Sequence, residues 1–290
     1  MSLTKIRKIG LALAFSPRME AIMAEAMRLV HLYNSLLVLV HVGDKSKEAE
    51  EKVAQLIANY NLDKERIKIL WKKGDPAESI LKACHEEGVD LLIAGALKKE
   101  NLMQHYLGSI ARKILRKANC SVLMLTNPVL DPKPFSNIVL NAEDSAYVHE
   151  ALGMACNIAR HDEASWVHVV REVKFYGLSM AAVDDCTEEE YNEVRNGLLK
   201  TEIESVEQLL HKVPHEGVKI NIKLLSGKSG FELSKFAQRK QADLLVVGAS
   251  PRRFFLFDRV FTHDLEYIFQ DLPCNLLIVK PTNRKEASNG

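Results

Sequence analysis

The chain has 290 residues, 47% hydrophobic and 27% charged, which is typical of a globular protein with two domains of ordinary size. No run of about 18 apolar residues occurs in the sequence, so we predict no membrane-spanning helix. No cluster of Lys and Arg residues is interleaved with aromatic residues as on nucleic-acid-binding faces. The expected classes therefore exclude membrane proteins and nucleic-acid-binding proteins.

The distribution of charge and the cysteine content indicate the kind of ligand and the cellular compartment to expect. Residues 1–130 carry 20 Lys and Arg against 14 Asp and Glu, which favours an anionic ligand there, although a chance bias of surface charge explains it more simply. The five cysteines, an odd number, include no Cys-x-x-Cys pair and no Cys/His spacing for a metal. We therefore predict a cytoplasmic protein with free thiols and no metal site of this kind.

In the first half, short apolar runs alternate with amphipathic stretches. Ile22, Ala26 and Leu29 show helical spacing, whereas the strand runs are continuously apolar, as expected for strands covered on both faces. Strands are predicted at 6–14, 35–42, 66–72, 90–95 and 121–126. Helices are predicted at 18–33, 46–60, 76–88 and 108–118. This alternation predicts a parallel sheet with right-handed crossovers.

The second half repeats this order after a proline-rich segment. Three prolines within residues 128–135 predict a stiff, extended linker. Strands follow near 137–142, 164–170, 218–225, 243–248 and 275–280. Residues 171–186 form an insertion, and Thr187 with Glu190 makes a capping box that starts a long helix. We predict a first domain at 1–127, a linker at 128–135, a second domain at 136–282 and a tail at 283–290.

The two halves also share sequence. Val89–Gly95 (VDLLIAG) returns as Ala242–Gly248 (ADLLVVG), and both halves close with a cysteine followed by a strand. A repeat of this length indicates two tandem copies of a whole domain. The predicted fold class is therefore α/β, Rossmann-like, with two tandem domains that are each a five-stranded parallel sheet between helices.

The end of the fourth strand carries a candidate anion site. Gly95–Lys98 is followed, after nine residues, by Gly108–Ser109, where a helix is predicted to start. Ligands of parallel α/β sheets bind at the carboxyl ends of the strands, near the point where strand order reverses. Glycines allow close approach of the backbone, and a helix N-terminus donates to phosphate. The alternative is that Gly95 makes a tight turn and Ser109 only caps the helix.

This spacing resembles the G-x2-G-x9-G-[S/T] signature of the universal stress protein family. Phe15–Pro17 after the first strand, His41–Val42 at the end of the second and Cys120–Leu125 at the close are also similar to that family. The resemblance covers nearly the whole chain as two copies. It implies binding of ATP or a related adenine nucleotide, with Mg²⁺ as a candidate companion ion, and assembly through the last strands.

The resemblance also carries over a set of nucleotide-binding residues in the first copy. The implied set is Ala14, Phe15, Val42, Gly95, Lys98, Gly108, Ser109, Ser121 and Val122. Lys98 departs from the family pattern because it stands at the second glycine of the signature, where it can reach a phosphate or crowd the loop. Ala14 departs because the family usually has an acidic residue there that contacts the adenosine.

The second copy departs further. Gly248 matches, whereas Pro251 and Thr262 stand at glycine positions, and Glu143 keeps an acidic group at the end of the first strand. The loop carries Arg252–Phe257, whose aromatic residues either fold over an empty site or contact a partner. We therefore expect a degenerate, structural or regulatory second domain.

No set of residues identifies an enzyme. His41 and His168, interpreted as equivalent positions at second-strand ends, are expected to be hydrogen-bonded supporting residues, and nothing marks a base that would activate Ser109. The predicted protein is a non-enzymatic adenine-nucleotide-binding stress protein. A ligand-free interaction or scaffold protein of the same fold, and a weak ATPase, are the alternatives. The final strands, 121–126 and 275–280, predict an intramolecular pseudo-dimer, with a homodimer as a further option.

Overall fold

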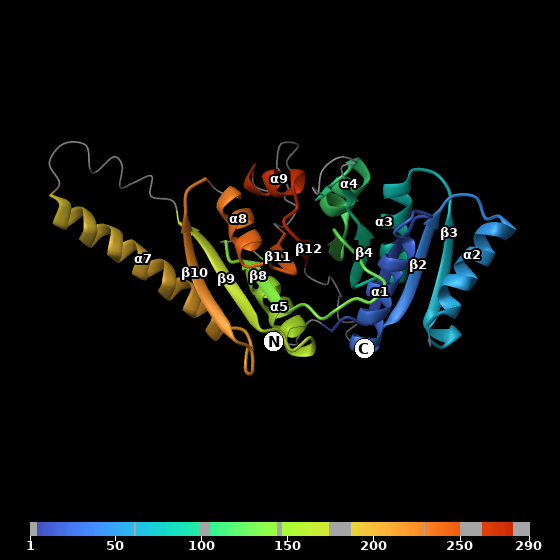
Figure 1. Cartoon of the computed structure of the whole chain (residues 1–290), viewed down its shortest axis with the longest axis horizontal. Helices are drawn as coiled ribbons and strands as arrows, with labels where there is room; N and C mark the ends of the chain where they lie inside the picture. The colour runs from blue at the N-terminus through green and yellow to red at the C-terminus, as the bar shows by residue number, and fades with distance from the viewer. Residues whose placement is uncertain are drawn as a thin grey trace, which may run out of the picture. The chain divides into compact units, whose positions relative to one another are not determined.

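The computed structural model describes residues 5–60, 62–98, 105–143, 147–173, 187–228, 230–249 and 263–280 (Figure 1). Strands and helices alternate along the chain as the apolar pattern predicts. The strands are β1 (Lys8–Leu13), β2 (Leu36–Val42), β3 (Ile67–Lys72), β4 (Leu91–Gly95), β5 (Leu97–Lys98), β6 (His105–Tyr106), β7 (Ser121–Leu125), β8 (Asn137–Asn141), β9 (Trp166–Val173), β10 (Ile220–Ser226), β11 (Leu244–Gly248) and β12 (Asn275–Val279). The helices are α1 (Met19–Tyr33), α2 (Lys47–Ala58), η1 (Lys64–Arg66), α3 (Pro76–Glu87), α4 (Ser109–Lys117), α5 (Val148–His161), α7 (Glu188–His211), α8 (Phe231–Arg239) and α9 (His263–Gln270).

The chain divides into two compact units. The N-terminal unit comprises Ser2–Lys133 and Asn275–Gly290, and the C-terminal unit comprises Pro134–Cys274. In the N-terminal unit the strand order is β12-β7-β4-β1-β2-β3, and all pairs are parallel except β12 with β7. In the C-terminal unit the order is β10-β9-β8-β11, with all pairs parallel. The predicted α/β class with two tandem domains is confirmed.

Apolar side chains cover both faces of these sheets. Leu37–Val40 in β2 and Leu244–Val247 in β11 are all at most 2% exposed. Successive side chains of a strand point to opposite faces, so each face needs its own helical cover. Helix α1 supplies such cover with a buried face that includes Met23, Met27 and Val30. The strand runs are therefore continuously apolar rather than alternating.

The aspartate of the sequence repeat holds the start of the first strand in each unit. The Asp90 carboxylate accepts hydrogen bonds from the backbone N–H groups of Arg7–Lys8, at 2.8 and 2.9 Å. Asp243 accepts the equivalent pair from Ser136–Asn137, both at 2.8 Å. Both aspartates therefore act at the amino ends of the strands and serve the fold rather than the candidate site.

The last strand of the chain belongs to the sheet of the N-terminal unit. β12 pairs antiparallel with β7, and Leu277 lies opposite Leu123. The side-chain oxygen of Asn275 accepts hydrogen bonds from the backbone N–H and the hydroxyl of Thr126, at 3.0 and 3.2 Å. Side-chain contacts from both strands thus fix the pairing at this end.

Hydrogen bonds from Lys280 hold the other end of the β12–β7 pair. Its ammonium group donates to the carbonyls of Leu115 and Ala118, at 2.8 and 2.7 Å. Its backbone N–H donates to the Ser121 hydroxyl at 3.1 Å. A cation near a helix C-terminus is stabilising, so Lys280 supports both β7 and α4.

The predicted capping box is confirmed. The Thr187 hydroxyl accepts from the backbone N–H of Glu190, and the Glu190 carboxylate accepts from the backbone N–H of Thr187. Helix α7 follows directly (Figure 1). β9 runs on to Val173, so the first three residues of the predicted insertion belong to this strand, and residues 174–186 lie outside the described ranges.

Candidate functional site

The carboxyl end of the N-terminal sheet has the topology of a ligand site. β1 and β4 are neighbours, but β1 leads along the chain to β2 on one side and β4 leads to β7 on the other. Ligands of parallel α/β proteins bind where strand order reverses in this way. Ala14–Phe15 follow β1 here, Gly95 ends β4, and Ala96 follows it. We call these strand ends the switch point.

Helix α4 starts near this point without a side-chain cap. Its N-cap is Gly108, with φ −69° and ψ 173°, and its first turn has no acidic residue. Helices α2 and α3, by contrast, are capped by the side chains of Ser46 and Asp75. Ser109 is the first helical residue and is exposed, so it is not the cap residue that the alternative interpretation requires. The N–H groups of the first turn and the Ser109 hydroxyl suit an anion.

A short hairpin brings the two parts of the signature together. β5 pairs antiparallel with β6, and Lys98 lies opposite His105. The chain therefore returns to Gly108 beside the segment that follows Gly95. Residues 99–104, between the two strands, lie outside the described ranges.

The two signature glycines differ in what surrounds them. A Cβ on Gly95 would lie 2.7 Å from Cδ1 of the half-buried Ile22 in α1, so this side chain would have to shift. A Cβ on Gly108 would meet Cδ1 of Leu97 at 2.7 Å, but that atom ends a side chain that is 50% exposed and can move. The φ of Gly95 is not positive. Of the two glycines, Gly108 is the one whose substitution disturbs the core less, because Leu97 is more exposed than Ile22.

Aromatic rings line the ends of β1, β2 and β3. The His41 ring lies 4.5 Å from the Phe15 ring and 5.1 Å from the Trp71 ring, measured between centroids. His41 Nδ1 lies 3.0 Å from the Leu13 carbonyl oxygen, and because a carbonyl only accepts, Nδ1 is the donor. The expected hydrogen bond of His41 is confirmed, whereas its supporting role stays a prediction. Val42 follows it and is half-buried, as is Trp71.

Sequence reasoning missed Arg18, which lies at the switch point. Arg18 is the N-cap residue of α1, immediately beyond the loop that follows β1. Its Nη1 donates to the Thr126 carbonyl at 2.8 Å, and its Nη2 donates to the Ala96 carbonyl. Burial lowers the pKa of this guanidinium, although an arginine stays charged. The sequence signal that could have identified Arg18 is a basic residue between the first predicted strand and the start of the first predicted helix.

Two of the implied site residues lie elsewhere. Ser121 pairs with Leu91 at the amino end of β4, whereas Gly95 pairs with Leu125 at the carboxyl end. The Ser121 hydroxyl is hydrogen-bonded to the backbone of Lys280. Ser121 and the adjacent Val122 are therefore not brought together with the signature residues, because motif spacing does not say which end of a strand faces the site.

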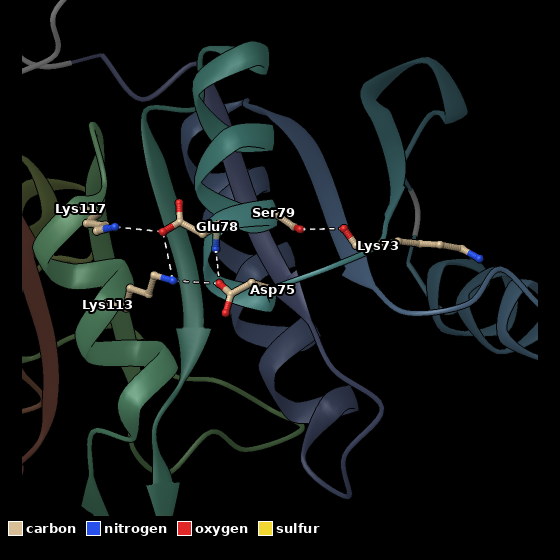
Figure 2. A network of polar contacts seen from close by, with 6 residues as sticks. All are labelled: Lys73, Asp75, Glu78, Ser79, Lys113 and Lys117. Carbon is tan, nitrogen blue, oxygen red and sulfur yellow. Dashed lines mark hydrogen bonds and ion pairs between the residues drawn. The ribbon is translucent and has the colours of Figure 1, made fainter.

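Helix α4 is tied to α3 by a network of charges (Figure 2). Lys113 contacts Asp75 and Glu78 at 3.1 and 3.0 Å, and Lys117 contacts Glu78 at 2.9 Å. The Glu78 backbone N–H lowers the pKa of Asp75, and the hydrogen bond from Lys117 lowers the pKa of Glu78. Such exposed pairs add little stability, but together they set how α4, and so its N-terminus, lies against α3.

The second copy has a different set of groups at its strand ends. In the first copy, Ile9 of β1 pairs with Leu37 of β2, and in the second copy the equivalent Ile138 of β8 pairs with Val167 of β9. His41 lies four residues after Leu37, and Arg171 lies four residues after Val167. The counterpart of His41 is therefore Arg171. The expected equivalence of His168 is therefore wrong. It failed because β9 extends to Val173, which puts His168 third in the strand.

These groups are engaged by the helices of the C-terminal unit. Arg171 forms a 3.3 Å ion pair with Glu202 of α7. Glu172, the counterpart of Val42, accepts from the backbone N–H of Gly230 at 3.0 Å, at the start of α8. The counterpart of Arg18 is Tyr147, the N-cap residue of α5. Pro251, Thr262 and the loop Arg252–Phe257 lie outside the described ranges.

No group of three or more His, Cys, Asp or Glu side chains in the described ranges could hold a metal ion. The described cysteines, Cys84, Cys120, Cys156 and Cys274, are free and buried. Over the same part of the chain, no helix has the length and apolar character needed to cross a membrane.

The fold defines a tandem α/β protein whose first copy has a strand-order switch point at the ends of β1 and β4. The family model of the universal stress protein family matches residues 5–126 and again 134–280. The chain therefore belongs to the universal stress protein family.

Individual relatives agree with this assignment. Universal stress protein MJ0531 of Methanocaldococcus jannaschii is 28% identical over 155 residues, covering 52% of this chain and 85% of that protein. Universal stress protein MJ0577 of the same organism is 37% identical over 60 residues, which cover 21% of this chain and only 37% of that relative. A crystal structure of a universal stress protein from Archaeoglobus fulgidus has a TM-score of 0.70 at 14% identity, covering 97% of this chain and 99% of its own. At that identity the structure supports the fold alone.

Proposed function

We propose that the first domain, residues 1–127, binds ATP or a related adenine nucleotide. The observation that carries this proposal is the uncapped start of α4, which the β5–β6 hairpin returns to the end of β4 at the switch point. Gly95, Lys98, Gly108 and Ser109 would surround the phosphates. The proposed organisation continues with a linker at 128–135, a second domain at 136–282 and a tail at 283–290.

The adenosine would lie over the ends of β1 and β2. Ala14 and Phe15 are exposed there, and Val42 ends β2. The Phe15 ring already packs against His41, which presents an aromatic surface of the kind on which bases stack. Because Ser121 and Val122 lie at the other end of β7, they are not part of the proposed site.

Gly108→Val tests the phosphate placement. We expect the affinity for ATP to fall at least several-fold, because a branched side chain would occupy the space next to the first-turn N–H groups. The fold should tolerate the change, since the new Cβ meets only the end of the exposed Leu97 side chain. Isothermal titration calorimetry measures the effect, after denaturation and mass spectrometry have identified any nucleotide that copurifies.

A matched control is Gly197→Val in α7. A Cβ there has no neighbour within 4 Å, and the position lies in the C-terminal unit. It should leave ATP affinity unchanged. Equal affinity of Gly108→Val and wild type would refute the placement of the phosphates.

The second domain is not expected to bind nucleotide in the same way. Pro251 and Thr262 stand at the glycine positions of the second copy. The Glu172 carboxylate, the counterpart of Val42, is already hydrogen-bonded to the backbone N–H of Gly230 at the start of α8. Titration should therefore give no more than one nucleotide per chain. A stoichiometry of two would show that the second copy is a working site.

Two alternatives remain distinct outcomes of these measurements. A ligand-free interaction or scaffold protein is favoured by Ala14 and Lys98, which depart from the family pattern, and would bind no nucleotide at all. A weak ATPase would release ADP on incubation with ATP, whereas a binding protein would return ATP unchanged.

We also propose that the two domains form an intramolecular pseudo-dimer through their final strands. The antiparallel pairing of β12 with β7 supports this, because β12 lies in the second family match, 134–280. A homodimer would use a further surface, and light scattering of the full chain would detect it.

A further inference from the structure

The guanidinium of Arg18 lies across the switch point. Arg18 follows β1 in the chain, yet its two terminal nitrogens donate to carbonyls that follow β4 and β7. Nη2 lies 3.9 Å from the position that a Cβ on Gly95 would take. A cation is therefore held against the glycine that ends β4.

The charge at this point has the opposite sign to the one expected from the family. Ala14, at the end of β1, contributes no carboxylate, and α4 has no acidic residue in its first turn. A guanidinium has five N–H donors. Here Nη1 and Nη2 each donate to one carbonyl oxygen, and these uncharged acceptors do not neutralise the charge of Arg18. Carbonyls orient a guanidinium, and a phosphate is the partner that its planar fork fits best.

We propose that Arg18 is a specificity-determining residue that makes this site select phosphorylated adenine ligands over adenosine. The inference rests on the proposed function, since it concerns the same site. Arg18 and the start of α4 would approach a phosphate from two sides, α1 and α4, with Gly95 between them. Desolvation of the guanidinium strengthens such an interaction, because charges attract more strongly where water is excluded.

The second copy lacks this cation. Tyr147 stands at the N-cap of α5, where α1 has Arg18. Its phenol has a single O–H donor and cannot hold a phosphate in a bidentate fork. Among the described residues, a guanidinium at this helix start is therefore a feature of the first domain.

The test compares adenosine, AMP and ATP with wild-type protein, Arg18→Gln and Arg66→Gln by calorimetry on the full chain. Arg66 is the matched control, because its Nη2 also donates to a backbone carbonyl, that of Ser35 at 2.7 Å, but at the amino end of β2. Wild type should bind AMP at least tenfold more tightly than adenosine. Arg18→Gln should reduce this preference by tenfold or more through weaker AMP and ATP binding, with adenosine affinity unchanged, whereas Arg66→Gln should keep it.

The outcomes separate the two proposals. If wild type binds none of the three ligands, the proposed function is overturned and this inference with it. If wild type binds AMP and Arg18→Gln binds it equally or more tightly, only the role of Arg18 is overturned. Should Arg18→Gln fail to fold, Arg18→Lys replaces it: loss of the fork should reduce the AMP preference several-fold, and full retention would overturn the inference.

Discussion

Replacing Asp90 with alanine is expected to lower the free energy of unfolding of the N-terminal unit by about 3 kcal/mol. The side chain is only 6% exposed, and its carboxylate accepts two backbone N–H groups at the start of β1. Alanine leaves both donors without their acceptor and removes two charge-assisted hydrogen bonds. Urea unfolding gives the loss, and hydrogen exchange of residues 5–98 shows where it falls.

Two further variants make this result specific. Asp243→Ala removes the equivalent pair of bonds in the C-terminal unit, so faster exchange should appear in residues 137–173 instead. Asp63→Ala is the control, because that exposed aspartate makes no side-chain cap bond at η1. If Asp90→Ala were as stable as Asp63→Ala, the repeated aspartate would have no structural role.

Leu277→Ala should destabilise the N-terminal unit by about 3 kcal/mol, although the residue is near the end of the chain. Leu277 is 1% exposed and lies opposite Leu123 in the β12–β7 pair. Truncation leaves a cavity beside β7 that the surrounding side chains fill only in part. Hydrogen exchange of the β7 amides, residues 121–125, should accelerate together with the loss of stability.

Leu245→Ala is the matched control for this prediction. Leu245 is 0% exposed and lies in β11, which pairs with β8 in the C-terminal unit. It should cost a similar amount but accelerate exchange in β8, residues 137–141. If Leu277→Ala left β7 protected, β12 would not be a member of the N-terminal sheet in solution.

The sequence motif identified some residues of the proposed site and missed others. The spacing from Gly95 to Ser109 located the end of β4 and the start of α4, because both are local features with strong signals in the sequence. The family resemblance implied Ser121 as a site residue, whereas the structure puts it at the amino end of β7. Arg18 was overlooked because its partners, the Ala96 and Thr126 carbonyls, are 78 and 108 residues away in the chain.

The sequence by itself determined the alternation of strands and helices, the tandem repeat and the capping box at Thr187, since each depends on residues a few positions apart. Only the tertiary structure decided that Arg171 and not His168 is the counterpart of His41, because strand length and register depend on the neighbouring strand. It also decided that β12 joins the sheet of the first copy. Parallel and antiparallel partners are chosen by hydrogen bonds and burial between distant segments, which no local pattern encodes.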